Sequence, residues 1–231
     1  MALPVFDTPR YKTKLPSSGE VIEYRPFVVK EQKMLLMATQ ASVDEQVDAV
    51  YRAVNACTFD ALNVSKLASF DVEYLFLQIR ARSVGEKIEM VLTCECTAKQ
   101  NSTLDITSVN VQRDPEHTNV IELTNNVMVK LRYPTMKEVD ALTQDRTVDA
   151  VIGLVAKSID SIWQGDEMFA ATDYSLAELI EFVENLSPAS LEKIEQFFTT
   201  MPVLRHDLEW ACKECSKINK VTLEGIQSFF A

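Results

Sequence analysis

Residues 88–106 read IEMVLTCECTAKQNSTLDI, and the stretch has the pattern of a β-hairpin with two cysteines at its tip. Every second residue from Ile88 to Leu92 is apolar, and the same period returns from Leu104 onward. A two-residue period places alternate side chains on opposite faces of a strand. We therefore expect two antiparallel strands that bring Cys94 and Cys96 to the turn between them.

A second hairpin of the same kind is predicted near the other end of the chain. Strand-like segments at 203–211 and 218–223 flank the sequence Cys212-Lys-Glu-Cys215, which has the form of a zinc knuckle. Structural zinc takes four ligands, and Cys94 with Cys96 supplies the two that this turn lacks. The sequence thus predicts one composite zinc site, drawn from two zinc-ribbon-like hairpins with 115 residues between them. Lys213 and Lys217 would offset part of its negative charge.

Other roles for the cysteines stay open at this point. Reduced and idle thiols are one alternative, and a redox pair is another, although a redox Cys-x-x-Cys precedes a helix and Cys215 precedes a strand. A catalytic zinc would need an open position and a base. His206 lies about 20 Å of strand from Cys212, and His117 lies in a polar loop. Cys57 ends an apolar helix and is expected to be a buried small hydrophobe.

The rest of the chain alternates between helical and strand-like periods, which indicates the α+β class: a helical body with several hairpins. Hairpins are expected at 12–29 and 120–131; helices are expected at 29–57 with a break near Ala41, at 71–82, from 135, and at 147–162, 175–185 and 187–200. We expect an N-terminal half (1–115) with the first cysteine hairpin and a C-terminal half (116–231) with the second, or one domain that includes both.

Charge and motifs exclude several classes of function. The 231 residues carry a net charge of −11, which disfavours phosphate-contacting nucleic-acid binding and anionic membranes. No apolar run reaches a membrane-spanning length, and the first residues lack a secretory signal, so a cytosolic start is expected. Nucleotide-binding, zinc-protease and serine-hydrolase motifs are absent. We expect no enzyme, no catalytic residues and no nucleic-acid or membrane partner. Phe229-Phe230 is expected to dock on the chain itself or on a partner.

Two separated segments resemble a known family. Leu15–Ala38 carries a Leu-Pro-Ser-x-Gly turn followed by Arg-Pro-Phe-x-Val-Lys-Glu, and Phe70–Glu86 carries Asp-x-Glu-Tyr-Leu-Phe and ends in Arg-Ser-x-Gly-Glu. Both segments, in this order, resemble the signatures of T4-type tailed-phage baseplate proteins. The cysteine-bearing hairpin that follows also fits that family.

The resemblance implies a baseplate hub component, or a transient chaperone that helps to assemble the hub, in a contractile-tail phage. Its partners would be other baseplate and tail proteins, which it would meet in the host cytoplasm or in the virion tail. The resemblance identifies no metal ligands and no partner-binding residues. A metal-dependent hydrolase and a generic adaptor with idle cysteines remain as alternatives.

Overall fold

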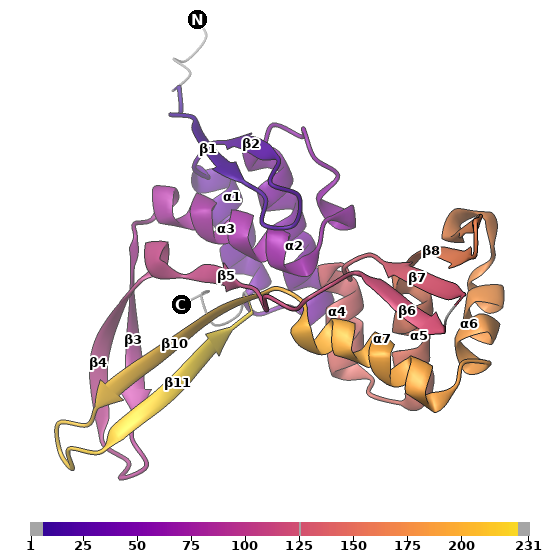
Figure 1. The fold of residues 1–231 in the computed structure, drawn as a ribbon. Helices are drawn as coiled ribbons and strands as arrows, with labels where there is room; N and C mark the ends of the chain where they lie inside the picture. The colour runs from indigo at the N-terminus through magenta and orange to yellow at the C-terminus, as the bar shows by residue number, and fades with distance from the viewer. Residues whose placement is uncertain (1–6, 125, 226–231) are drawn as a thin grey trace, which may run out of the picture. The chain divides into compact units, whose positions relative to one another are not determined.

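The computed structural model describes residues 7–124 and 126–225 and has the α+β fold that the sequence predicts (Figure 1). The chain divides into two compact units. The first comprises Met1–Lys66, Phe70–Gln112 and Val203–Ala231, and the second comprises Leu67–Ser69 and Arg113–Pro202. The second unit is therefore an insertion in the first, and the segments with the four paired cysteines all belong to the first unit. Phe229-Phe230 lies outside the described residues.

The first unit begins with the predicted hairpin, formed by β1 (Tyr11–Lys14) and β2 (Val21–Tyr24). Its loop closes with hydrogen bonds from the Leu15 amide to the Glu20 carbonyl and from the Gly19 amide to the Leu15 carbonyl. Gly19 has φ +73°, a backbone region that glycine enters without steric cost. The turn is thus built by the Leu-Pro-Ser-Ser-Gly sequence itself.

Three helices follow, at α1 (Val29–Ala38), α2 (Val43–Cys57) and α3 (Ser69–Ser83). The predicted break near Ala41 is confirmed, because Ser42 caps α2 and its hydroxyl accepts from the Glu45 amide. A short 3₁₀ turn, η1 (Val64–Lys66), precedes α3. The apolar side of α3 includes Leu77, which packs with residues from the strands of this unit.

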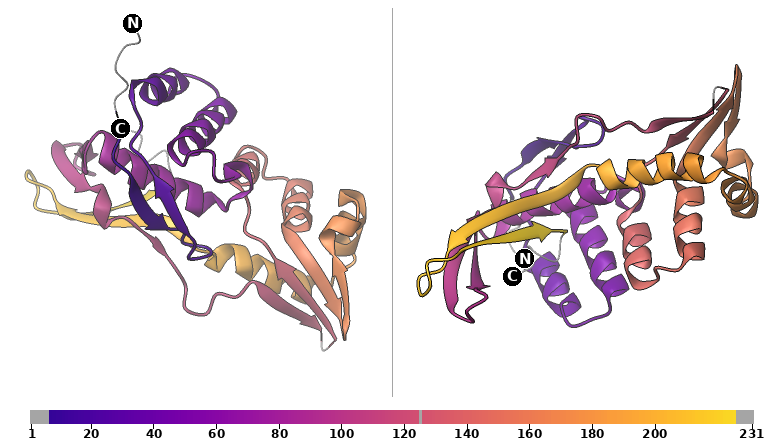
Figure 2. Two further views of the ribbon diagram at one scale, coloured as in Figure 1. Left: turned by 90° about the horizontal axis from the view of Figure 1, so that it is seen from above. Right: turned by 60° about the horizontal axis from the view of Figure 1, so that its bottom comes forward.

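Those strands form two sheets. The first is the pair β3 (Lys87–Thr93) and β4 (Lys99–Asp105), and the second has the order β11-β10-β5, with β10 at Val203–Ala211, β11 at Ile218–Glu224 and β5 at Asn110–Gln112. Both predicted cysteine hairpins are therefore present. A 3₁₀ turn, η2 (Ile106–Ser108), joins β4 to β5. In Figure 2 the β10–β11 hairpin runs beside the β3–β4 hairpin.

The second unit is built on a four-stranded antiparallel sheet of order β6-β7-β8-β9. Its strands are β6 (Val120–Thr124), β7 (Val127–Leu131), β8 (Ile159–Gln164) and β9 (Glu167–Ala170). The helices are α4 (Met136–Gln144), α5 (Val148–Ser158), α6 (Leu176–Glu184) and α7 (Pro188–Thr200), with a 3₁₀ turn, η3, at Ala171–Asp173. A core of buried apolar side chains from sheet and helices, among them Val129, Leu131 and Ile194, joins these elements.

One predicted element of this unit is wrong in extent. The helix expected at 147–162 ends at Ser158, and Ile159 begins strand β8. Ile159 and Ile162 are β-branched, and the register of β8 with β7 places Ile162 opposite Val129. A short apolar run fits either a helix or a strand, and the pairing with β7, which is distant in sequence, decides for the strand. Among the described residues, no helix is long and apolar enough to cross a membrane.

Candidate metal centre

The two cysteine hairpins place their thiols in equivalent positions. Cys94 follows β3 directly, and Cys212 follows β10 directly. Each hairpin then turns within a few residues, and the turn carries the second cysteine, Cys96 or Cys215. Both hairpins belong to the same unit, and their tips lie close to each other (Figure 1). The four thiols are therefore brought together.

Backbone hydrogen bonds fix both turns in a similar way. The Thr97 amide donates to the Cys94 carbonyl at 2.8 Å, and the Ser216 amide donates to the Cys212 carbonyl at 2.9 Å. Thr97 has φ +69° and Ser216 has φ +58°, so the residue after the second cysteine is left-handed in both turns. This reversal of the chain lets both thiols of a hairpin face the same point.

The four sulfur atoms all lie within 4.8 Å of one another. Sγ of Cys94 lies 3.7 Å from Sγ of Cys215, and Sγ of Cys96 lies 3.7 Å from Sγ of Cys212. Sulfurs at the corners of a tetrahedron around zinc, each about 2.3 Å from the ion, would be about 3.8 Å apart. A disulfide would need about 2.05 Å, and all four cysteines are free. The spacing therefore fits a tetrahedral metal site.

Burial differs between the two thiols of each hairpin. Cys94 and Cys212 are buried, whereas Cys96 and Cys215 are exposed. The buried pair forms a small cluster with Leu92 and Trp210. This cluster has four buried members, two of which are the cysteines themselves, and the apolar residues that pack against it are only partly buried: Met90, Ala98, Leu208 and Val221.

Polar groups support the cluster from both hairpins. The side-chain amide of Asn219 on β11 donates to Sγ of Cys94 at 3.4 Å. The backbone amide of Lys213 donates to Oε1 of Gln100 at 3.2 Å. Lys217, expected to offset the charge of the site, forms an ion pair with Glu95, and this pairing raises the pKa of its ammonium group. Sequence reasoning missed Asn219, whose place opposite Trp210 follows only from the strand register.

The two thiols of the first hairpin, Cys94 and Cys96, have pKa values that shift in opposite directions. The pKa of Cys94 falls to about 6, chiefly because the Cys96 amide donates to its sulfur. The pKa of Cys96 rises to about 12: the Ala98 amide lowers it, but hydrogen bonds with the thiols of Cys215 and Cys94 outweigh that effect. Several thiolates in one cluster repel one another, and a bound cation removes that penalty.

The other candidate side chains lie outside the cluster. Cys57 is fully buried, and burial raises the pKa of its thiol to about 12, which agrees with a packing role. His206 is half-buried in β10 opposite Leu223 and is not among the clustered ligands.

His117, which the sequence placed in a polar loop, has specific contacts in the second unit. Its Nδ1 lies 2.9 Å from Oγ1 of Thr200 and its Nε2 lies 3.0 Å from Oη of Tyr133. The ring also stacks on Tyr133, with centroids 5.6 Å apart. Its role is to join the start of this unit to α7, which no local sequence pattern indicated.

The arrangement can hold one metal ion through four sulfurs. Cys94, Cys96, Cys212 and Cys215, the predicted ligand set, are brought together, and no fifth Cys, His, Asp or Glu of the described chain belongs to the group. A site filled by four thiolates leaves no open coordination position for a substrate or an activated water.

A comparison with known families gives the context of this fold. A model of the family described as T4 bacteriophage base plate protein matches residues 8–231, a range that includes both signature segments and all four clustered cysteines. Comparisons with the curated proteins and with the solved structures found no match. The match covers nearly the whole chain and confirms the resemblance at Leu15–Ala38 and Phe70–Glu86. The chain therefore belongs to the T4 bacteriophage base plate protein family.

Proposed function

We propose that this chain is a hub protein of a contractile-tail base plate, or a chaperone that assembles the hub, and that it acts by binding neighbouring base plate proteins. The observation that carries the proposal is the family match over residues 8–231. A structural role also agrees with the lack of catalytic motifs and with the acidic charge of −11, which disfavours nucleic acid as a partner.

We further propose that the four clustered cysteines bind a structural zinc ion. Thiolate ligands in a tetrahedral set favour zinc, or iron in some proteins, over hard cations. The ion would hold the tips of β3–β4 and β10–β11 together, next to a cluster that buries only Leu92 and Trp210 besides two of the cysteines. Its role would be to fix the shape of the first unit, and not to activate a substrate.

Deletion of the gene in the phage that carries it tests the function. The expected result is tails without complete base plates, rescued by expression of the chain from a plasmid. Normal infectious particles from the deletion strain would contradict the proposal. Mass spectrometry of purified virions then separates the two forms of the role, since a hub component stays in the particle and a transient chaperone does not.

The alternative of a metal-dependent hydrolase requires an ion with an open position. X-ray absorption at the zinc edge distinguishes the two. Four sulfur neighbours at about 2.3 Å would support the structural site, and an oxygen neighbour would favour the hydrolase.

A further inference from the structure

The sheet of the second unit has two edge strands, β6 and β9, and only β6 carries a bulge and a lysine contact along its edge. Strand β6 carries a bulge between Glu122 and Thr124 in its pairing with β7. The ammonium group of Lys193 on α7 also donates to the Glu122 carbonyl at 2.7 Å and to the Leu123 carbonyl at 3.4 Å. Bulges and lysines are the usual devices that prevent a further strand from adding to an edge.

Strand β9, the opposite edge, has neither device. Its sequence Glu-Met-Phe-Ala contains no lysine and no proline, and its pairing with β8 is regular. Among residues 7–124 and 126–225 no other strand pairs with it. A two-residue loop with Gly165 at φ +62° joins it to β8, so the flanking pair Gln164–Glu167 is hydrogen-bonded. Alternation along the ladder then points the main-chain groups of Met168 and Ala170 outward.

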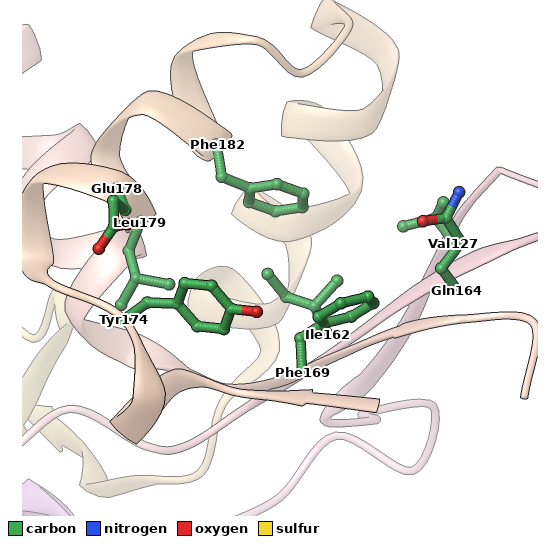
Figure 3. Close-up of a pocket in the computed structure, with 8 residues that line it drawn as sticks. All are labelled: Val127, Ile162, Gln164, Phe169, Tyr174, Glu178, Leu179 and Phe182. Carbon is green, nitrogen blue, oxygen red and sulfur yellow. The ribbon is translucent and has the colours of Figure 1, made fainter. Parts of the chain in front are cut away.

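An apolar pocket lies beside this edge, on the face of the sheet that α6 covers. It has a volume of about 370 Å³. Figure 3 shows Ile162 and Phe169 on the sheet side, with Phe182 and Leu179 of α6 across from them and the ring of Tyr174 between. The volume is near the lower end of the range for small-ligand sites, which is about 300–1,000 Å³. It has room for a large side chain but not for a helix.

The pocket lies on the face of the sheet toward which Phe169 of the edge strand points. Phe169 of β9 and Ile162 of β8 are paired in the ladder and both line the pocket. A strand added next to β9 would carry its residue opposite Phe169 on that same face, because cross-strand neighbours lie on one side of a sheet. That residue would be directed toward the pocket, while its neighbours would face the other side.

Charge indicates what kind of strand would bind. Residues 113–202 contain 7 Lys and Arg but 16 Asp and Glu, so this segment carries a net charge of −9 out of −11. Glu178 lines the pocket, and Glu167 begins the edge strand. Two copies of this unit joined at β9 would place like charges together, which opposes a homodimer. A basic partner meets no such repulsion.

We propose that β9 and the adjacent pocket bind an extended basic segment of another protein as a fifth antiparallel strand. One aromatic or large aliphatic side chain of that segment, opposite Phe169, fills the pocket, and basic side chains on either side meet the acidic surface. This site deepens the proposed function, since it names a surface by which the chain binds a neighbour. Main-chain pairing supplies affinity in such complexes, and the pocket supplies specificity.

Peptide titration of the full chain by isothermal calorimetry tests the site. The probe is Lys-Thr-Lys-Phe-Lys-Thr-Lys, which has the length of an ordinary strand, and the matched controls replace every Lys by Glu or the Phe by Ala. The expected result is binding of the basic peptide, at least about tenfold weaker binding of the alanine peptide, and none of the acidic one. Equal binding of the basic and acidic peptides, or no heat with the basic peptide at millimolar concentration, would overturn the proposal.

Two pairs of protein variants locate the contact. Met168→Pro removes an outward amide while the bonds to β8 remain, and Met168→Thr removes the same side chain but keeps the amide. Tyr174→Ala removes a pocket wall, whereas Tyr174→Phe keeps it. Proline and alanine should each weaken binding at least about tenfold relative to their partners. Equal affinities within each pair, with unchanged circular dichroism, would rule out the site. Failure of these peptide tests, together with incomplete base plates in the deletion strain, would rule out this site and leave the base plate role intact.

Discussion

The sulfur atoms of Cys94 and Cys215 lie 3.7 Å apart, although 121 positions separate the two residues in the chain. The contact joins a hairpin that precedes the inserted second unit to one that follows it. Closing so long a loop costs considerable chain entropy, and a metal ion bound to both hairpins would compensate for it.

Removal of one thiol should empty the site. We expect Cys215→Ser to lower the metal content below one ion per chain, because a hydroxyl is a much poorer zinc ligand than a thiolate. Cys57→Ala is the matched control, since Cys57 is buried but not part of the cluster. Inductively coupled plasma mass spectrometry of both variants gives the answer. Full metal content in Cys215→Ser would show that this thiol is not a ligand.

Chelation should loosen one part of the molecule. After treatment with a strong chelator, amide protons of β3–β4 and β10–β11 near the tips should exchange faster, since the cluster around Leu92 and Trp210 is small. Amides of β7, in the centre of the second unit's sheet, serve as the internal control and should keep their protection. Hydrogen exchange with mass spectrometry measures both. Uniform loss of protection in the two units would argue against a local role for the ion.

The buried ion pair between Arg25 and Glu31 should contribute more to the free energy of unfolding than the exposed capping contacts of Glu45 with Ser42. Glu31 is 3% exposed, lies 3.0 Å from Arg25, and also accepts from the Val28 amide at 2.9 Å. Glu31→Ala would leave Arg25 half-buried without this partner, and we expect a loss of about 3 kcal/mol in the free energy of unfolding.

Glu45 is the control for that substitution. It holds the same third position of α2, but its bonds to Ser42 are exposed. Glu45→Ala should cost only about 0.5–1 kcal/mol. Urea denaturation compares the two, and an equal loss would mean that the buried pair contributes no more than a surface cap.

Stability of the second unit should fall as the pH falls below about 6.5. Burial lowers the pKa of His117 from its ordinary value of 6.5. The Thr200 hydroxyl donates to the Gln196 carbonyl, so it accepts from Nδ1–H of His117, and Nε2 is left to accept from Tyr133. Between the two pKa values the unfolded chain binds a proton that the folded chain does not, which favours unfolding.

This pH dependence can be assigned by substitution. His117→Asn has no group that titrates in this range, so its second unit should lose less stability between pH 7 and pH 5.5 than that of the unsubstituted chain. Hydrogen exchange of β7 amides at both pH values is the measurement. The same slope in both proteins would mean that another group is responsible.

Local signals in the sequence were sufficient for most helices and for the two hairpins that carry the clustered cysteines. Ser42, Thr135 and Ser175 each accept from the amide three residues on, as their capping boxes predicted. The cysteine hairpins could be read from a two-residue period that ends in turn residues. In these cases a short segment contains the whole physical reason for its structure.

Strand β9 was missed although its partner β8 is only two residues away, whereas other missed features depend on distant partners. Strand β8 begins within a segment of helical character, and β5 has only three residues, which pair with β10. The contacts of His117 with Tyr133 and Thr200 likewise arise from folding of the second unit. Long-range pairing selects these structures, and no local pattern records it.

Elemental analysis of the freshly purified chain, produced without added metal, shows directly whether the four clustered cysteines hold a structural zinc ion. We expect one zinc ion per chain, and its loss when Cys96 or Cys212 is replaced by serine, because each variant keeps only three of the four sulfur ligands. Protein that is folded and free of stoichiometric zinc or iron would contradict this expectation, and the four thiols would then be a reduced cluster with no structural ion.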